Sequence, residues 1–331
     1  MFIFVSGGKT MGHISPLLGI ILSFKDKYEF IYFGLENSME EKICQKYNIT
    51  FHKMKLLPFY KRNIFKNIFT VFYILKERRR IKKIYKDYDV AYIISSGGFV
   101  SIPLVLSFKK SKKLLLESNT TLGLANRFLS IFVDYVGIQF NTIKLKKSIL
   151  IGNPIVIEKE EYDHLWFYTN EPLILFVGGS NGAYEIVELA YLFNKNYPDI
   201  KIFVITGERY YDSFKFNNNV VVVKSIFKLS SVLYKFKLVI SRAGASTITE
   251  LLLSNVDFIL FPSKNVSNNH QYKNAKYLYD NNMCGIITGD NFDKDIKYVY
   301  NRFKNANDML REENNITIKD SIKRIGELLN I

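Results

Sequence analysis

Short apolar runs alternate with longer amphipathic segments along most of this 331-residue chain. This alternation is typical of parallel β-strands that are joined by helices. The strand-like runs are residues 2–6, 30–33, 91–95 and 114–117 in the first half, and residues 173–177, 202–205, 220–223, 238–240 and 258–261 in the second. The sequence therefore predicts an α/β fold with two doubly wound parallel sheets.

A charged, irregular stretch over residues 158–171 interrupts the alternation just after Asn153-Pro154. We expect a boundary there, with a first domain over residues 1–157 and a second over residues 158–315. The closing segment 316–331 has apolar residues at helical spacing, so we predict a helix that packs back on the first domain. Two consecutive doubly wound domains would hold a ligand in a cleft between the carboxyl ends of their strands.

The chain is basic, with a formal net charge of +15 and a pI near 9.4. This balance favours an anionic partner, which leaves nucleic acid, a nucleotide and an anionic membrane open. The first residues lack the basic region and cleavage site of a secretion signal, so they predict a strand and a cytoplasmic protein. Cys44 and Cys284 lie far apart and outside any metal-ligand cluster, which favours a reduced intracellular protein.

The uncharged run over residues 90–108 is long enough to span a membrane. It contains four serines, two glycines and a proline, which are unfavourable in one apolar span. We therefore predict a strand, a glycine turn and a helix in this run.

Each predicted domain opens with a glycine-rich turn after its first strand. The first turn reads Gly7-Gly8-Lys9-Thr10-Met11-Gly12-His13, and the second reads Gly178-Gly179-Ser180-Asn181-Gly182-Ala183. Such turns let backbone amides face an anion at a helix start, although many α/β folds use them only for tight packing. The order of residues excludes a Walker phosphate loop, because Gly-Lys-Ser/Thr does not close either motif.

The stretch from residue 238 to 271 is the strongest signal for a ligand. An apolar strand runs into Ser241-Arg242-Ala243-Gly244-Ala245, where Gly244 allows close approach and Ser246 or Thr247 can cap a helix. Glu250 lies about one turn into that helix, where a carboxylate can accept hydrogen bonds from a ribose diol. The pattern indicates a sugar-nucleotide site, and the alternative is a plain strand followed by a capped helix.

A third glycine turn, Ser95-Ser96-Gly97-Gly98-Phe99, is followed by Glu117-Ser118-Asn119 and by Gly123-Leu124-Ala125-Asn126-Arg127. In this order the motifs resemble the MurG family of glycosyltransferases, glycosyltransferase family 28. Members of that family add N-acetylglucosamine to undecaprenyl-pyrophosphoryl-muramyl-pentapeptide (lipid I), which gives lipid II in peptidoglycan biosynthesis. The resemblance covers the chain from Gly7 to about Ala275.

This resemblance implies the GT-B fold, in which two Rossmann-like domains face a cleft, and a UDP-N-acetylglucosamine-dependent hexosyltransferase. The first domain would hold the acceptor and the second the UDP-sugar. Thr10, Met11 and Gly12 match the family's loop near the sugar, and His13 matches its histidine. Asn119 matches the asparagine that binds the hydroxyls of the donor sugar.

In the second domain the resemblance places Ser180 at the donor pyrophosphate, with Asn181 beside it, and the backbone of Ile226 at uracil. Glu250 would bind the ribose hydroxyls, and Gln271 and Asn274 would contact the sugar. The loop and helix start around phosphate and ribose comprise Ala245, Ser246, Thr247, Ile248, Thr249 and Glu250.

The sequence also departs from the family pattern. Val156 stands where family members commonly have an arginine. Leu116 replaces a frequent histidine, and His270 replaces a usual glutamine.

The expected reaction needs a base for the attacking hydroxyl and stabilisation of departing UDP. His13 is the first candidate for the base, and a structural or phosphate-contacting imidazole is its alternative role. Glu117 is the second candidate, and its alternative is a hydrogen-bonding role in its loop. Because no Asp-x-Asp pair follows a strand, we expect a helix amino end and Ser180 to stabilise UDP, with no cofactor and no protein-held metal. Direct displacement would invert the anomeric centre.

Residues 56–86 combine apolar side chains at helical spacing with basic clusters, which suits peripheral contact with an anionic membrane. The alternative is a core helix with a solvated basic face. No nucleic-acid fingerprint accompanies the pattern, so we expect no nucleic-acid partner and a place at the cytoplasmic face of the cell membrane. The apolar residues are Phe59, Tyr60, Ile64, Phe65, Ile68, Phe69, Phe72, Tyr73 and Leu75, and the basic ones are Lys61, Arg62, Lys66, Lys76, Arg78, Arg79, Arg80, Lys82 and Lys83.

Two other functions fit the same sequence. One is another GT-B enzyme, either a glycolipid glycosyltransferase that uses diacylglycerol or a UDP-N-acetylglucosamine epimerase. The other is a non-catalytic subunit that binds a sugar nucleotide and anchors a partner. Turnover of donor and lipid acceptor separates these from the transferase.

Overall fold

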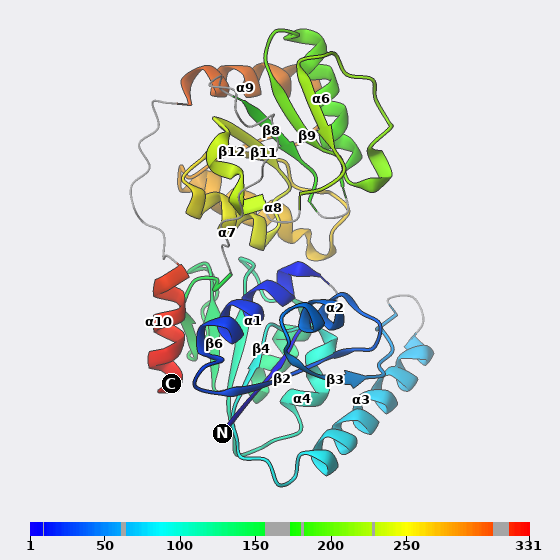
Figure 1. Ribbon diagram of the computed structural model, residues 1–331, viewed down its shortest axis with the longest axis vertical. Coiled ribbons are helices and arrows are strands. Elements are labelled where there is room, and N and C mark those ends of the chain that lie inside the picture. Colours follow the sequence, from blue (N-terminus) through cyan, green and yellow to red (C-terminus); the bar gives the residue numbers. More distant parts are fainter. Residues whose placement is uncertain (9, 61–63, 156–172, 180–181, 227–228, 307–317) are drawn as a thin grey trace. The chain divides into compact units, whose positions relative to one another are not determined.

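The computed structural model describes residues 1–8, 10–60, 64–155, 173–179, 182–226, 229–306 and 318–331. The chain divides into two compact units, Met1–Val156 with Ile316–Ile331 and Ile157–Asn315. Each unit contains one parallel sheet with helices packed along it (Figure 1). The predicted α/β class with two parallel sheets is confirmed.

In the first unit, seven parallel strands of the described residues form the sheet, in the order β3-β2-β1-β4-β5-β6-β7. Its strand order reverses at β1, because the chain proceeds outward from β1 to β3 and then continues from β4 on the other side of β1. The carboxyl ends of β1 and β4 lie level, since Ser6 pairs with Ser95. A reversal of this kind opens a crevice at the carboxyl edge of a sheet. The strands are β1 (Phe2–Ser6), β2 (Glu29–Leu35), β3 (Thr50–Met54), β4 (Val90–Ser95), β5 (Lys112–Glu117), β6 (Tyr135–Ile138) and β7 (Ser148–Leu150).

Two sets of helices cover the two faces of this sheet, because side chains alternate along each strand. Phe4 of β1 joins an apolar cluster with α3 (Ile64–Ile84), α4 (Ile102–Val105) and α5 (Leu124–Leu129). Its neighbours Ile3 and Val5 join a second cluster with α1 (Met11–Phe24) and α10 (Ile318–Leu329). The remaining helices are α2 (Met39–Lys46) and the short 3-10 turns η1 (Phe99–Ser101) and η2 (Ser130–Phe132).

The last helix, α10, packs beside α1 in the first unit (Figure 1). Ile325 and Leu329 are fully buried in the cluster on that face. Two polar contacts fix the helix to the sheet. The Arg324 guanidinium donates to the Leu150 carbonyl over 2.6 Å, and the Tyr92 hydroxyl donates to the Leu329 carbonyl.

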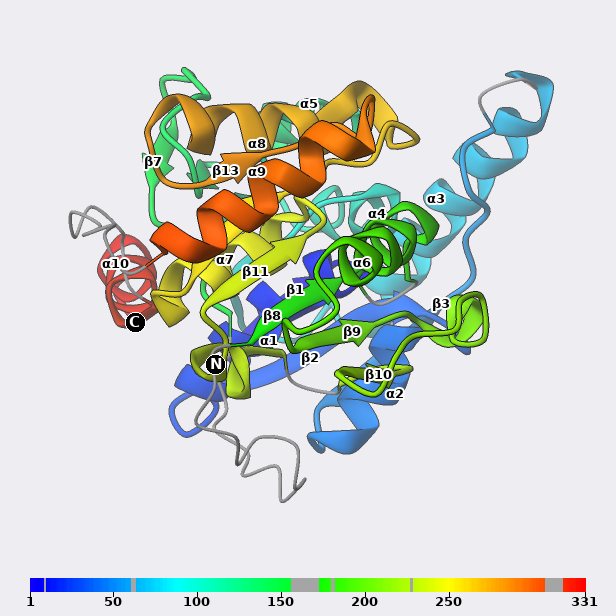
Figure 2. The same ribbon diagram turned by 90° about the horizontal axis from the view of Figure 1, so that it is seen from above.

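The sheet of the second unit has the order β10-β9-β8-β11-β12-β13 and reverses between β8 and β11. Figure 2 shows β11, β8, β9 and β10 side by side in this order. Helices α6 (Tyr184–Asn196) and α9 (Phe292–Asn305) pack together on one face through Phe193 and Val299. The strands are β8 (Ile174–Val177), β9 (Ile202–Ile205), β10 (Val220–Val223), β11 (Leu238–Ser241), β12 (Asp257–Leu260) and β13 (Gly285–Ile286), and the other elements are α7 (Ala245–Ser254), α8 (His270–Asp280), η4 (Glu208–Tyr210), η5 (Leu229–Ser231), η6 (Leu233–Lys235) and η7 (Ser267–Asn269).

Each predicted strand is present, with its ends shifted by at most two residues. The interpretation of residues 90–108 is also correct, since they form β4, a glycine turn, η1 and α4. The sequence did not predict β3, β6, β7 and β13, which are short or rich in polar residues. Most of the predicted boundary, residues 156–172, lies outside the described residues.

We predict that Ile325→Ala destabilises the first unit by about 2–5 kcal/mol, because it opens a cavity in a fully buried cluster. Glu327→Ala is the matched control, since Glu327 lies two residues along the same helix with its side chain exposed. Thermal unfolding followed by circular dichroism measures both. Equal unfolding temperatures for the two variants would show that α10 adds little to the core.

Candidate functional site

His13 is held across the strand reversal of the first unit. It is the third residue of α1, and its Nδ1 atom lies 2.7 Å from the Ser96 carbonyl oxygen just after β4. A carbonyl oxygen only accepts hydrogen bonds, so Nδ1 carries a proton, and in the neutral ring the lone pair is on Nε2. The contact therefore fixes the ring and makes Nε2 the basic nitrogen of the neutral imidazole.

Glycine is required in the turn that leads to His13. A Cβ atom on Gly7 would collide with the Ser96 hydroxyl, because the ends of β1 and β4 approach closely there. Thr10 adopts an extended conformation before the helix, and it is exposed like Met11. Gly12 and His13 are half-buried. The predicted residues of this loop thus lie together at the carboxyl edge of the sheet.

Glu117 is a buried carboxylate at the end of β5, and it accepts four hydrogen bonds from described residues. Its Oε1 atom accepts from the backbone and side-chain amides of Asn119, both over 3.0 Å. Its Oε2 atom accepts from the Gly123 amide over 3.1 Å and from Asn126 Nδ2 over 2.9 Å. This geometry favours the loop-holding role over the role of a base.

Asn126 links two turns at this edge. Its Oδ1 atom accepts from the Gly98 amide over 3.2 Å, while its Nδ2 atom donates to Glu117 and to the Leu116 carbonyl. The approach is possible because Gly97 has a positive φ of 90° and no Cβ to meet the Asn126 amide. The sequence motif around Asn126 does not indicate this role, because the partners of its side chain at Gly98 and Glu117 lie outside the motif.

In the second unit, α7 begins at Ala245, two residues earlier than a cap at Ser246 would place its start. Gly244 is the N-cap, with an extended backbone, and no side-chain cap bond forms at this start of the described helix. The prediction that Ser246 or Thr247 caps the helix is therefore wrong, because both lie within its first turn. The first-turn amides of a helix without a cap are open to an anion.

The residues predicted around this helix start differ in exposure. Ile248 is fully buried in the core, so only its backbone can reach a ligand. Thr249 donates its hydroxyl to the Ala245 carbonyl over 2.9 Å. Ser246 Oγ has no hydrogen-bond partner among the described residues. Its hydroxyl in the first turn is therefore suited to an oxyanion.

Burial raises the pKa of Glu250 from its ordinary 4.5 to about 7, against the lowering effect of a hydrogen bond from the Ser230 backbone. The carboxyl group is therefore poised between its neutral and charged forms near neutral pH. Ligand hydroxyls that donate to it would favour the charged form.

An ion pair that the sequence did not reveal crosses the reversal of the second sheet. Arg242 follows β11, and its guanidinium lies 2.5 Å from the Glu185 carboxylate in the first turn of α6. Arg242 also donates to the Phe261 carbonyl over 3.1 Å and stacks against that ring. The contact joins residues 57 positions apart, which explains why no local pattern indicated it.

The other predicted donor residues lie at the same edge. Gln271 Oε1 accepts from the Ser263 amide over 2.8 Å. Asn274 is fully buried and donates to the Ala243 carbonyl over 3.3 Å, which favours holding the turn over contacting a sugar. Ile226 follows β10 and is half-buried. Ser180 and Asn181 lie outside the described residues.

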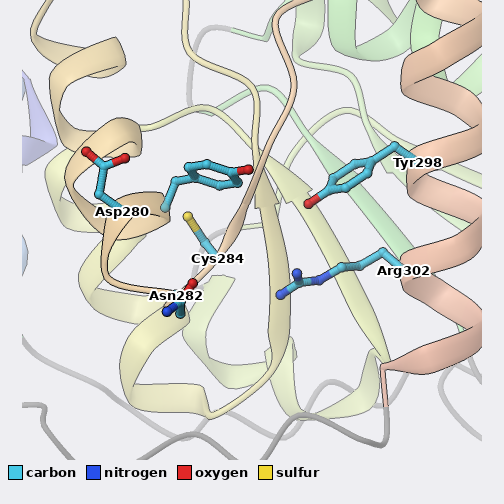
Figure 3. Close-up of a pocket in the computed structure, with 6 residues that line it drawn as sticks. Asp280, Asn282, Cys284, Tyr298 and Arg302 are labelled. Atoms are coloured by element: carbon cyan, nitrogen blue, oxygen red, sulfur yellow. The ribbon is translucent and has the colours of Figure 1, made fainter.

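A cavity of about 460 Å³ lies at the opposite edge of the second sheet. Figure 3 shows Tyr298 and Arg302 extending from α9 toward Cys284, which precedes β13. Arg302 is paired in two hydrogen bonds, of 2.8 and 2.7 Å, with Asp257 at the start of β12. No predicted site residue lines this cavity, whose lining is Tyr279, Asp280, Asn282, Cys284, Tyr298 and Arg302.

Two family models match the chain. The glycosyltransferase family 28 N-terminal domain matches residues 3–138, and the family 28 C-terminal domain matches residues 173–325. The chain belongs to glycosyltransferase family 28. The first model lies within the first compact unit, and the second covers the second unit and continues into α10 of the first.

Relatives of similar length support this assignment. A UDP-N-acetylglucosamine–N-acetylmuramyl-(pentapeptide) pyrophosphoryl-undecaprenol N-acetylglucosamine transferase of Listeria monocytogenes is 33% identical over 87% of this chain and 86% of its own. A transferase of the same name from Bacillus thuringiensis is 31% identical over 100% of this chain and 99% of its own. The crystal structure of Acinetobacter baumannii MurG matches with a TM-score of 0.75 at 19% identity and covers 99% of both chains. The resemblance to the MurG family and the GT-B fold are thus confirmed.

We predict that Glu250→Gln stabilises the protein increasingly as pH rises from about 4.5 to about 7. The folded state keeps the Glu250 proton up to a higher pH than the unfolded state, so ionisation costs the wild type stability over this window. Glutamine resembles the neutral acid and does not ionise, so the variant does not lose this stability. The variant should match the wild type near pH 4.5 and exceed it by at most about 3 kcal/mol at pH 8. Chemical denaturation at several pH values measures the difference, and a constant difference would contradict the prediction.

Proposed function

We propose that this protein transfers N-acetylglucosamine from UDP-N-acetylglucosamine to lipid I and forms lipid II, with inversion at the anomeric carbon. Membership in family 28 and the full-length relatives support this activity. The observation that carries the proposal is the His13 imidazole, whose Nδ1 is fixed by Ser96, so that Nε2 is the nitrogen that can accept a proton.

In this mechanism the acceptor sugar is held at the carboxyl edge of the first sheet. His13 Nε2 takes the proton of the acceptor hydroxyl as its oxygen attacks the anomeric carbon of the donor. The bond from that carbon to the pyrophosphate oxygen breaks, and UDP leaves with the electron pair. Attack from the side opposite UDP converts the α-linked donor into a β-linked product.

The second unit supplies the donor site in this proposal. The first-turn amides of α7, with the Ser246 hydroxyl and Ser180, stabilise the negative charge of the departing UDP. Glu250 binds the ribose hydroxyls, and the backbone of Ile226 reads uracil. Gln271 contacts the sugar, while Asn274 holds the turn that carries Ala243.

Glu117 acts as a positioning residue in this proposal. The same carboxylate holds both amides of Asn119, the residue that we assign to the donor sugar hydroxyls. A carboxylate that already accepts hydrogen bonds on both oxygens is a poor proton acceptor for a substrate. The role of base therefore falls to His13.

The exposed apolar surface of α3 supports a lipid-linked acceptor. One stripe of the helix, which includes Ile74 and Ile81, is buried in the core. The opposite stripe, which we name the α3 apolar surface, is exposed and comprises Phe65, Ile68, Phe69, Phe72 and Leu75. Contiguous exposed apolar side chains mark binding surfaces, and the exposed basic residues beside them suit anionic lipid.

Attachment to the membrane is peripheral in this proposal. Among the helices of the described residues, none is long and apolar enough to cross a bilayer. The α3 apolar surface would instead insert at the cytoplasmic face of the cell membrane, where the acceptor resides. An epimerase that acts on a nucleotide sugar alone would have no use for this surface.

Turnover by the purified protein tests the function. With UDP-N-acetylglucosamine and lipid I, the transferase releases UDP and forms a β-linked disaccharide on the lipid. An epimerase would change the donor sugar without lipid I, and a non-catalytic subunit would release no UDP.

We expect His13→Ala to lower kcat by roughly 10²–10⁴-fold and to leave donor affinity nearly unchanged, because only the proton acceptor is lost. Steady-state kinetics and calorimetric titration of UDP-N-acetylglucosamine measure the two quantities. A loss of donor affinity with unchanged kcat would make His13 a binding residue.

Replacing Phe65, Phe69 and Phe72 by Ser should weaken binding to anionic vesicles and turnover of a long-chain acceptor, because the inserted apolar area is lost. Turnover of a water-soluble acceptor should persist. A variant with Tyr234→Ser and Tyr279→Ser, which removes exposed aromatic side chains of the second unit, is the control. Vesicle sedimentation measures binding after circular dichroism confirms folding. Full vesicle binding by the folded triple variant would place the membrane contact elsewhere.

A further inference from the structure

A second cavity, of about 350 Å³, lies in the first unit at the carboxyl ends of β2 and β3. None of the residues assigned above to substrate or catalysis lines it. We propose that this cavity binds the first isoprene units of the acceptor lipid, next to its pyrophosphate. The inference rests on the proposed function, since it assumes a polyprenol-linked acceptor.

The lining of the cavity suits a hydrocarbon chain. Most of it is apolar, and its volume falls within the range of pockets that take small molecules. A hydrocarbon chain has no hydrogen-bond donors or acceptors, so apolar side chains alone can bind it. The apolar lining residues are Leu35, Met54, Leu56, Leu57 and Tyr73.

One carboxylate connects the cavity to the loop that leads to His13. Glu40 is fully buried, and its Oε1 atom accepts from the Leu35 amide over 3.2 Å. The same carboxylate packs so tightly on Gly8 that a Cβ atom there would collide with it. Glu40 thus lies between Leu35, which lines the cavity, and the loop where the acceptor sugar is proposed to bind.

The cavity is also continuous with the α3 apolar surface. Tyr73 lines the cavity, and its ring packs edge-on against the ring of Phe72 with centroids 6.0 Å apart. Phe72 is more than half exposed and belongs to the surface proposed to enter the membrane. An apolar path thus runs from the proposed membrane contact over Phe72 and Tyr73 into the cavity.

Charges at the mouth suit an anion next to the chain. Lys76 Nζ lies 5.9 Å from the centroid of the Tyr73 ring, and Lys55 lines the mouth. Lys55 is paired with Glu36 over 3.7 Å, but both side chains are well exposed, so the pair is weak. A chain in the cavity would place its pyrophosphate near these lysines.

The occupant follows from the geometry of the reaction. The acceptor sugar must reach His13 while the far end of its lipid stays in the bilayer. The isoprene units nearest the pyrophosphate must then leave the hydrocarbon layer. Burying these apolar groups against protein is more favourable than exposing them to water. The cavity offers that cover between the membrane contact and the catalytic loop.

Two water-soluble acceptors test the inference without vesicles. They carry the same sugar pyrophosphate, and one ends in a geranyl chain while the other ends in a methyl group. We expect the wild type to use the geranyl acceptor with a kcat/KM at least about tenfold higher. The variant Leu56→Asn should lose most of this preference, because a polar side chain would line the cavity.

Ile84→Asn is the control, since Ile84 lies on α3 like the lining residue Tyr73, is exposed and lies outside the cavity. It should keep the preference for the geranyl chain. If Leu56→Asn fails to fold by circular dichroism, Leu57→Asn takes its place.

Several outcomes would overturn the inference. Equal use of both acceptors by the wild type would show that the chain is not bound, while the proposed transferase activity would stand. An unchanged preference in the folded cavity variant, or equal loss in the Ile84→Asn control, would place the chain elsewhere. Lipid I is assayed in parallel: turnover of lipid I but of neither short acceptor would overturn the inference alone, and turnover of none of the three would overturn the proposed function as well.

Discussion

The reversal of strand order in each sheet is the constraint on which the site depends. At a reversal the chain leaves two neighbouring strands toward opposite faces, and the crevice between them is open at the carboxyl edge. In each unit a side chain forms a polar contact across that crevice. The His13 ring bonds to Ser96 in the first unit, and Arg242 pairs with Glu185 in the second. Both edges are thereby ordered before any ligand binds.

The two units hold a carboxylate at this edge differently. Glu117 receives hydrogen bonds on both oxygens, which offsets the cost of burying a charge and makes the carboxylate a structural anchor. Glu250 has a backbone hydrogen bond from Ser230 and a raised pKa, so it can respond to what binds beside it. A glutamate thus serves as a fixed support in the first unit, at Glu117, and as an adaptable contact in the second, at Glu250.

The sequence was sufficient for the parts of the fold and site that depend on local pattern. Apolar runs such as residues 202–205 predicted buried strands, and the glycine turns predicted the chain path around His13 and Gly244. Contacts between residues far apart in the chain could not be predicted from the sequence. The roles of Asn126 and Arg242 depend on partners far along the chain, and the burial of Asn274 depends on how α8 packs on the turn at Ala243. The prediction of the capping residue failed for a local reason. Gly244 adopts the extended N-cap conformation as readily as a serine does, so the helix begins before Ser246.

The position of α10 has a consequence for how the protein folds during translation. The first unit needs side chains from both ends of the chain, and the whole second unit is translated before Ile325 and Leu329 exist. Until then the face of the sheet covered by α1 lacks part of its apolar cover. Domains usually fold in the order of synthesis. Here the second unit, encoded later, has all of its residues before the first unit does, and the first unit is complete only after α10 has been translated.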